Sequence, residues 1–165
     1  MKLFLLRHAK AQDSWPDEER VLTKVGREQV SRLSSVLDSS MFSDVVQIWH
    51  SPYRRAVETA EIFREKTGTK ADLVPTANIT PDDNPYDIAR MIASLSCFDK
   101  DLMIVSHNPL LENLSDILLE GSKRGGRVIF RKCTLASFTL EFPPAPGREY
   151  GVWSMDALIS PAIIG

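Results

Sequence analysis

Residues 1–8, MKLFLLRH, contain the stretch that decides the fold: a continuous apolar run that ends at Arg7 and His8. Such a run is typical of a strand that is buried on both faces of a sheet. Two further runs have the same form, VVQIW at 45–49 and LMIV at 102–105. Segments with helical spacing of apolar residues alternate with these runs, at about 23–38, 54–66, 84–95 and 110–119. This alternation predicts an α/β fold in which helices cover a mostly parallel sheet.

The remaining elements are shorter or weaker in pattern. Residues 72–74 suit a short strand, 133–142 alternate as a strand does, and 150–155 suit an edge strand. Residues 11–21 are polar and contain a proline, so we expect a loop there. Glycines at 68 and 121 suit the C-terminal ends of two of the helices.

The composition is that of an ordinary globular protein. The chain has 165 residues, with 20 Lys and Arg against 22 Asp and Glu, a net charge of −2. This length predicts a single domain over residues 1–165. The charge argues against bulk nucleic-acid binding, which usually needs a basic excess. The apolar run at 3–6 is too short for a signal peptide or a membrane span, so we expect a cytoplasmic protein without a membrane partner.

The two cysteines exclude two classes of protein. Cys97 and Cys133 are too few for a disulfide scaffold. Neither begins a Cys-x5-Arg loop, which argues against a cysteine phosphatase.

Polar side chains follow the three apolar runs. Arg7-His8 ends the first run, Ser51-Pro-Tyr-Arg-Arg55 follows the second, and Ser106-His107 ends the third. In open α/β sheets, ligands bind at the carboxyl ends of the strands. The three segments therefore predict one pocket that contains two histidines and at least two arginines.

Such a pocket suits phosphoryl transfer. The planar fork of an arginine matches phosphate oxygens and stays charged, so Arg7 and Arg55 would hold a phosphoryl group. A histidine is a nucleophile when one ring nitrogen is free and the other is fixed by a hydrogen bond. A second imidazole, in its charged form, could donate to the phosphoryl oxygens.

The same residues carry a family resemblance. The sequence LLRHAKA around His8, Arg20-x-Leu-Thr-x-x-Gly26, SPYRRAxxTA around Arg55, and Val-Ser-His107-Asn follow one another in order. Over residues 1–120 the chain thus resembles the histidine phosphatase superfamily, and within it the short SixA-type phosphohistidine phosphatases. The resemblance implies the phosphoglycerate mutase-like, three-layer α/β/α sandwich. It also implies that His8 is the nucleophile that becomes phosphorylated, and that Arg7, Arg55 and His107 bind the phosphate.

The chain departs from the family pattern in two places. Ala9 stands where the first motif usually has glycine, and Asn108 follows His107 where one branch has aspartate. The other branch takes its general acid from the loop after the middle strand, which here offers Asp82 or Asp83. Neither aspartate matches a clear motif, and both also suit a turn before a helix.

The uncertain acid bears on the substrate. General acid catalysis is worth about 10²–10⁴-fold when an alkoxide must leave. The imidazole of a phosphohistidine, with an ordinary pKa of about 6.5, leaves far more easily. We therefore expect a metal-independent phosphatase, without a cofactor, that acts on phosphohistidine in a protein. Two alternatives stay open: a small-molecule phosphomonoesterase that uses Asp82 or Asp83, and a silent phospho-ligand binding module.

Several neighbouring residues have weaker assignments. Ser51 is expected to orient the pocket, and Lys10 to add positive charge at its mouth. Arg54 and His50 are expected to have structural or solvated roles. Three residues of the second motif suit conformational roles, as a loop anchor, a helix cap and a close packing contact: Arg20, Thr23 and Gly26.

Overall fold

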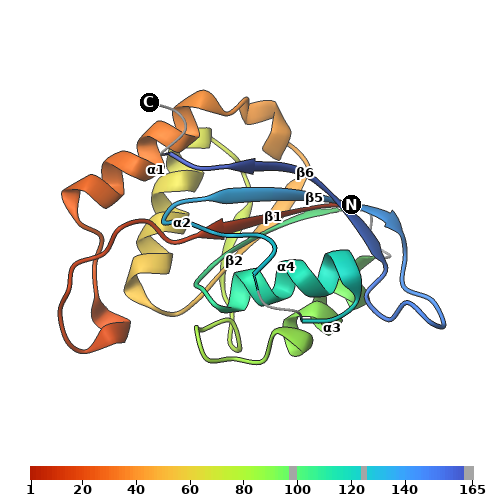
Figure 1. Ribbon diagram of the computed structural model, residues 1–165. Helices are drawn as coiled ribbons and strands as arrows, with labels where there is room; N and C mark the ends of the chain where they lie inside the picture. Colours follow the sequence, from red (N-terminus) through yellow and green to blue (C-terminus); the bar gives the residue numbers. More distant parts are fainter. Residues whose placement is uncertain (97–99, 124–125, 162–165) are drawn as a thin grey trace.

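The computed structural model describes residues 1–96, 100–123 and 126–161, and these residues form one six-stranded sheet (Figure 1). The strand order is β3-β2-β4-β1-β5-β6. The four strands β3, β2, β4 and β1 are parallel, while β5 and β6 run antiparallel to their neighbours. The strand bounds are β1 Lys2–Arg7, β2 Val45–His50, β3 Asp72–Pro75, β4 Asp101–Ser106, β5 Leu135–Phe142 and β6 Val152–Ile159.

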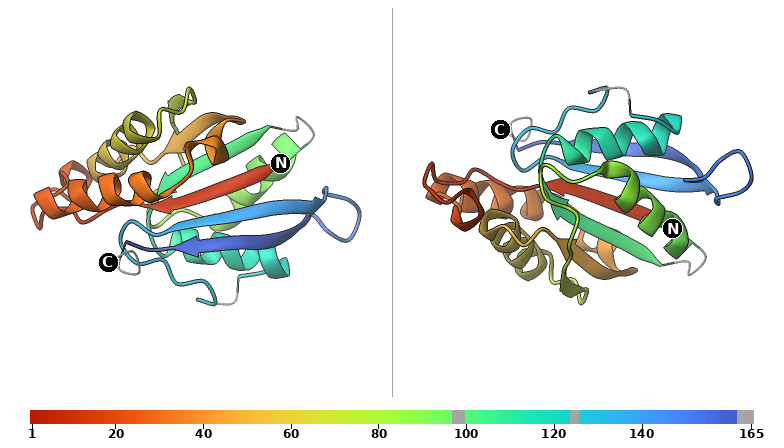
Figure 2. Two further views of the ribbon diagram at one scale, coloured as in Figure 1. Left: turned by 90° about the horizontal axis from the view of Figure 1, so that it is seen from above. Right: turned by 90° about the horizontal axis from the view of Figure 1, so that it is seen from below.

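Helices cover both faces of this sheet, as the two views along it show (Figure 2). One face packs against α1 (Lys24–Val36) and α2 (Arg54–Thr67), and the other packs against α3 (Pro85–Leu95) and α4 (Leu110–Glu120). Two short 3-10 helices, η1 (Asp17–Glu19) and η2 (Ser39–Phe42), complete the described elements. The expected three-layer α/β/α sandwich of the phosphoglycerate mutase-like type is confirmed.

The central strand β1 explains why the layers form. Its side chains alternate between the two cores: Leu3 and Leu5 pack toward α3 and α4, whereas Phe4 and Leu6 pack toward α1 and α2. All four are fully buried. Burial of each such side chain stabilises the fold by roughly 1.5–3 kcal/mol. The apolar run therefore fits only a strand with helices on both sides.

Local signals fix the ends of the helices. The Thr23 side chain accepts a hydrogen bond from the Gly26 amide at 3.0 Å, which caps α1 as expected. Gly26 is also required for close packing, because a Cβ atom there would lie 2.1 Å from the Lys10 carbonyl oxygen. The expected stops at Gly68 and Gly121 are confirmed, since both end helices in the left-handed conformation.

Two strands differ from the expectation at their ends. The last strand covers 152–159 rather than 150–155, because its pairing with β5 continues to Leu135 opposite Ile159. β5 begins at Leu135 rather than at 133, since Cys133 has a φ of 60°, which is outside the strand region. Cys133 is a buried free cysteine, and Cys97 lies outside the described residues.

No helix among the described residues is long and apolar enough to cross a membrane.

Candidate active site

The three motif segments meet at the carboxyl-terminal ends of the parallel strands. β1, β4 and β2 are parallel neighbours, so their carboxyl ends lie together. Arg7 pairs with Ser106 in register, and the His8 amide donates to the Ser106 carbonyl at 3.0 Å. On the other side of β4, the Ser51 amide donates to the Val105 carbonyl at 3.0 Å. The parallel pairing thus brings the ends of the three strands together, as the sequence predicts.

His8 has one fixed and one free ring nitrogen. Its Nδ1 lies 2.8 Å from the Ala9 carbonyl oxygen, which only accepts hydrogen bonds, so Nδ1 carries the proton. Nε2 therefore presents its lone pair, and it accepts from Arg55 Nε at 3.3 Å and from Lys132 Nζ at 3.2 Å. The side chain is buried, with 3% exposed. This is the tautomer that a nucleophilic Nε2 requires.

The surroundings keep His8 neutral. Burial, the largest cause, acts together with the neighbouring Lys132, His107 and Arg55 to lower its pKa to about 2, although the hydrogen bond to the Ala9 backbone raises it. At neutral pH the lone pair is therefore free of a proton. The cations that lower the pKa are also the groups that would attract an anion to Nε2.

Arg55 lies between His8 and an acidic loop. It begins the buried face of α2, and its Nη2 donates to the Asp17 carboxylate at 2.8 Å. Its Nη1 also donates to the Asp17 carbonyl oxygen. The pKa of Asp17 is lowered, mainly by the hydrogen bond from Arg20 and then by Arg55. Arg20, Asp17 and Arg55 thus form a chain of charges that ends at His8.

Arg7 uses part of its guanidinium to bind the backbone. Its Nη1 donates to the Phe130 carbonyl at 2.6 Å, while its buried Nε has no hydrogen-bond partner in the part of the chain that the structure describes. Burial lowers the pKa of Arg7, whereas Glu112 raises it. Glu112 itself accepts from the side-chain amide of Asn108 at 2.6 Å and from the Phe130 amide at 3.2 Å. Asn108, where one branch of the family has aspartate, therefore serves to hold the loop that Arg7 contacts.

His107 lies beside His8 and is bonded to Ser51. The two imidazole ring centroids are 4.9 Å apart, and His107 Nε2 lies 2.7 Å from the Ser51 hydroxyl. Its Nδ1 is buried and has no hydrogen-bond partner within the described ranges of the chain. Burial lowers the pKa of His107 to about 3, with Arg55 as the next cause. The sequence predicts a charged imidazole here, whereas the structure favours a neutral one, because burial and the charges of Arg55, Lys132 and Arg7 disfavour a further proton.

Two buried nitrogen atoms of this site, Arg7 Nε and His107 Nδ1, have no hydrogen-bond partner among the described residues. Buried polar groups are nearly always hydrogen-bonded, and an unmet donor costs about 1–3 kcal/mol. Arg7 Nε is a donor, and His107 Nδ1 is one in the tautomer that carries a proton there, so an oxygen-rich anion would satisfy both. The site therefore fits a phosphate group by charge and by hydrogen-bonding capacity.

The weaker candidates have other contacts. The Lys10 backbone binds Gln29 and Thr23, while its side chain is exposed. Asp83 accepts from the Thr80 amide and hydroxyl, both at 2.7 Å, in the manner of a turn residue. Asp82 is exposed. Within the described residues, no hydrogen bond or ion pair joins either aspartate to His8, so the general acid stays a prediction.

The residues with expected structural roles behave accordingly. His50 is buried, and its Nδ1 contacts the Ser51 carbonyl oxygen at 3.1 Å. Arg54 pairs with the buried Glu58 at 3.3 Å rather than with the site. Arg20 donates from Nε to the Gln12 carbonyl at 2.6 Å, which anchors the loop.

Sequence reasoning missed two charged residues of the site, Asp17 and Lys132. Lys132 belongs to no motif and comes from the segment between α4 and β5. Long-range backbone bonds place this segment: Cys133 donates to the His8 carbonyl at 3.2 Å, and Arg7 donates to the Thr134 carbonyl at 3.0 Å. No local sequence pattern predicts these contacts. Asp17 had a weak signal, because it precedes Arg20 in the second motif.

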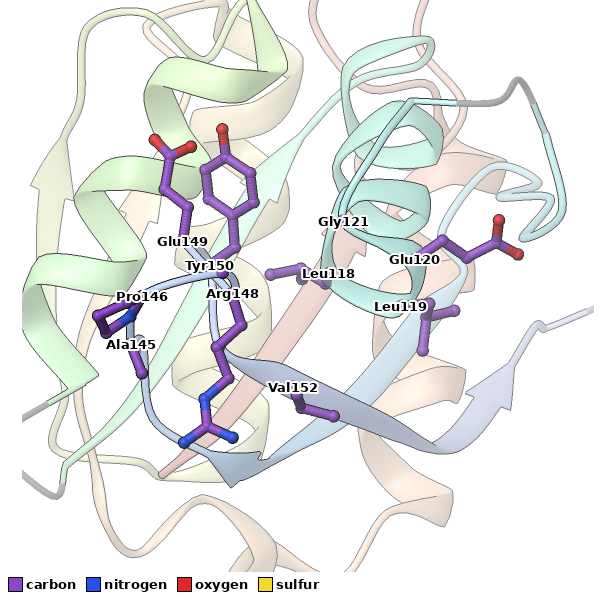
Figure 3. A pocket seen from close by; sticks show the side chains of 12 residues that line it. Leu118, Leu119, Glu120, Gly121, Ala145, Pro146, Arg148, Glu149, Tyr150 and Val152 are labelled. Atoms are coloured by element: carbon purple, nitrogen blue, oxygen red, sulfur yellow. The ribbon is translucent and has the colours of Figure 1, made fainter.

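A separate hollow lies at the opposite end of the strands, where the parallel strands begin (Figure 3). Its volume is about 780 Å³, and the C-terminal end of α4 and the β5–β6 connection line it. β5 is antiparallel to β1, so this connection lies where the parallel strands begin. Figure 3 shows Glu149 and Tyr150 pointing one way and Arg148 another, without a shared focus. The hollow contains none of the motif residues.

Among the described residues, no group of three or more His, Cys, Asp or Glu side chains is arranged to hold a metal ion.

Comparison with known proteins agrees with this geometry. The family model of the histidine phosphatase superfamily (branch 1) matches residues 3–78, which include Arg7, His8 and Arg55. Comparison with curated protein sequences gave no significant match.

Solved structures share the fold along the whole chain. The protein histidine phosphatase SixA, solved with tungstate, is 23% identical, with 100% of each chain covered and a TM-score of 0.84. A SixA protein of Agrobacterium tumefaciens is 19% identical, with 96% of this chain and 97% of that chain covered and a TM-score of 0.74. A mycobacterial glucosyl-3-phosphoglycerate phosphatase is 18% identical, with 94% and 97% covered and a TM-score of 0.65. The chain thus matches the model of the histidine phosphatase superfamily over residues 3–78, and it shares the fold of the SixA structures from end to end.

Proposed function

We propose that this protein is a metal-independent phosphatase that acts through a phosphorylated His8. One observation carries the proposal: the unprotonated Nε2 of buried His8 lies within hydrogen-bonding distance of two cations, while Nδ1 is fixed by a backbone carbonyl. Positioning and charge supply most of the catalysis in phosphoryl transfer. A preformed nucleophile beside cations meets both needs.

The reaction has two displacements. In the first, the Nε2 lone pair forms a bond to phosphorus, and the bond from phosphorus to the leaving atom breaks. The leaving atom takes the electron pair and a proton from solvent. In the second, water attacks the phosphorus of phospho-His8, the P–N bond breaks, and its electrons return to Nε2. The water proton passes to solvent, phosphate departs, and His8 is regenerated.

The residues around His8 have distinct proposed roles. Arg7 and Arg55 bind the phosphoryl oxygens and oppose the charge that builds on them. His107 donates to the same oxygens. When a dianion binds, it would raise the lowered pKa of His107, so that the imidazole could then take up a proton. Ser51 orients His107 through its hydroxyl.

The substrate proposed is phosphohistidine in a protein. His107 is followed by an amide rather than a carboxylate, and Asp83 is engaged in a turn. A leaving imidazole needs less help from an acid than a leaving alkoxide does. The similar SixA fold supports the same substrate class, and a single domain over residues 1–165 is part of the proposal.

A substrate panel with wild type and His8→Ala tests the proposal. We expect wild type to release phosphate from a phosphohistidine protein and from phosphoramidate much faster than from sugar phosphates, and equally fast with a chelator present. His8→Ala should lose this activity. Rapid quench with a ³²P-labelled substrate should trap label on wild type only. Faster turnover of sugar phosphates would refute the substrate class, and unlabelled wild type would refute the mechanism.

A further inference from the structure

Lys132 contacts the reacting atom of the site although it belongs to no recognised motif. Its ammonium lies 3.2 Å from Nε2 of His8, on the lone pair that would attack phosphorus. Arg55 Nε donates to the same atom at 3.3 Å. Two cationic donors thus share one acceptor, Nε2 of His8. Both hydrogen bonds must break before this lone pair can bond to phosphorus.

Lys132 has no anion of its own. Among the residues that the structure describes, no carboxylate forms an ion pair with it, although its side chain is exposed over much of its length. Desolvation of the ammonium, the largest cause, and the charges of Arg7, Arg55 and Arg20 together lower the pKa of Lys132 to about 8, whereas Asp17 raises it. An ammonium close to other cations and without a carboxylate partner is favourable when an anion binds beside it.

The backbone holds Lys132 in this place. The next residue, Cys133, donates its amide to the His8 carbonyl at 3.2 Å and adopts a φ of 60°. The Thr134 amide donates to the Arg131 carbonyl at 3.0 Å, which closes a turn around Lys132. Segment 131–134 is therefore held by backbone hydrogen bonds next to His8, the residue that carries the nucleophile.

We propose that Lys132 is a third cationic ligand of the phosphoryl group and moves its ammonium from Nε2 of His8 to a phosphoryl oxygen as the Nε2–P bond forms. Lys132 gains and loses no proton in this step. Leaving Nε2 frees the lone pair for attack, and reaching the oxygen neutralises charge that builds there. The assignment deepens the proposed function and rests on it for the reaction, but not for anion binding.

Tungstate binding measured by calorimetry tests the assignment without turnover. Tungstate stays a dianion from neutral to mildly alkaline pH, so changes in affinity report on the protein. Lys132→Met should weaken binding about ten- to a hundredfold, the usual loss for a hydrogen bond to a charged group. Lys132→Arg keeps the charge and should stay within about threefold of wild type. Lys70→Met is the matched control, because Lys70 is an exposed lysine just before β3, at the opposite edge of the sheet.

The pH profile separates this role from a structural one. The charged and titratable groups around Lys132 are His8, His107, Arg7, Arg20, Arg55 and Asp17. Before the anion binds, the two histidines and Asp17 have lowered pKa values, whereas the pKa of Lys132 is about 8. Lys132→Arg removes the titration of Lys132 and leaves any uptake of a proton by His107 in place, so the comparison of the two proteins isolates Lys132. Tungstate affinity should therefore fall above about pH 8 in wild type, and this fall should disappear in Lys132→Arg.

Two results would overturn the assignment. One is tungstate binding by Lys132→Met within about twofold of wild type. The other is an alkaline fall that persists unchanged in Lys132→Arg. Thermal unfolding of each variant shows whether it is folded. If wild type binds tungstate as expected but releases no phosphate from phosphohistidine, the proposed function fails and the Lys132 ligand assignment stands.

Discussion

Arg55 donates to the Asp17 carboxylate at 2.8 Å, so the guanidinium proposed to bind phosphate already holds an anion of the protein itself. Only 5% of the Arg55 side chain is exposed, against 41% of Asp17. Asp17 is thus the solvent-exposed partner of a buried cation. If Arg55 binds the phosphoryl group as proposed, we predict that Asp17 competes with that group for Arg55.

Replacement of Asp17 by Asn should tighten anion binding. An ion pair with a solvent-exposed partner is worth about 0.2–1 kcal/mol, so the dissociation constant of tungstate should fall by a factor of about 1.4 to 5. Calorimetry measures the change. Glu18→Gln is the control, since it removes a charge from the same η1 turn without a contact to Arg55. Weaker binding by the Asp17 variant would show that Asp17 positions Arg55 instead of competing for it.

Ser51→Ala should slow turnover more than it weakens the fold. It removes the hydroxyl that lies 2.7 Å from His107 Nε2, so the imidazole loses its orientation. One such hydrogen bond is worth about 0.5–1.5 kcal/mol, which corresponds to about a two- to thirteenfold loss in kcat/KM. Steady-state kinetics with phosphoramidate measures this loss. Ser35→Ala, at an exposed serine of α1, should have no effect. Unchanged kinetics in Ser51→Ala would remove Ser51 from the site.

The two site histidines should make the protein acid-sensitive. Their pKa values in the folded protein, about 2 for His8 and about 3 for His107, lie below the ordinary value of 6.5. The unfolded chain therefore binds more protons as the pH falls below about 6.5, and stability is lost from there toward about pH 3. The unfolding temperature of wild type should drop more between about pH 7 and pH 4 than that of the His8→Asn/His107→Asn double variant. Parallel curves for the two proteins would contradict the lowered pKa values.

Glu58→Gln should destabilise the loop that carries Asp17. The buried Glu58 carboxylate accepts from the Leu22 amide at 2.9 Å and pairs with Arg27 at 2.8 Å and Arg54 at 3.3 Å. A glutamine loses the charge and one acceptor. We expect a loss of about 1.5–3 kcal/mol, as for hydrogen bonds to charged groups, or about 4–10 °C in Tm for a chain of this size. Scanning calorimetry measures it, with the exposed Glu61→Gln in α2 as control. A Tm within about 1 °C of wild type would refute the anchoring role.

Local patterns in the sequence predicted most of the fold. The apolar runs at 3–6, 45–49 and 102–105 became β1, β2 and β4, because a run without charge is stable only when both faces are covered. Thr23, Gly68 and Gly121 ended helices as expected, since capping depends on a few neighbouring residues. The end of the last strand was less predictable. Its length follows from pairing with β5, which is not a local property.

The sequence by itself determined which functional side chains lie at the carboxyl-terminal ends of the parallel strands. Arg7 ends β1, His8 and His107 directly follow β1 and β4, and Arg55 lies in the first turn of α2, so the parallel pairing of the strands brings the four residues together. Only the tertiary structure decided how the site is charged. Lys132 reaches His8 from a distant segment, and Asp17 reaches Arg55 from a loop. Burial and the three nearby cations then keep His107 neutral, against the expectation of a charged imidazole. Protonation depends on desolvation and on charges close in space, and neither follows from spacing along the chain.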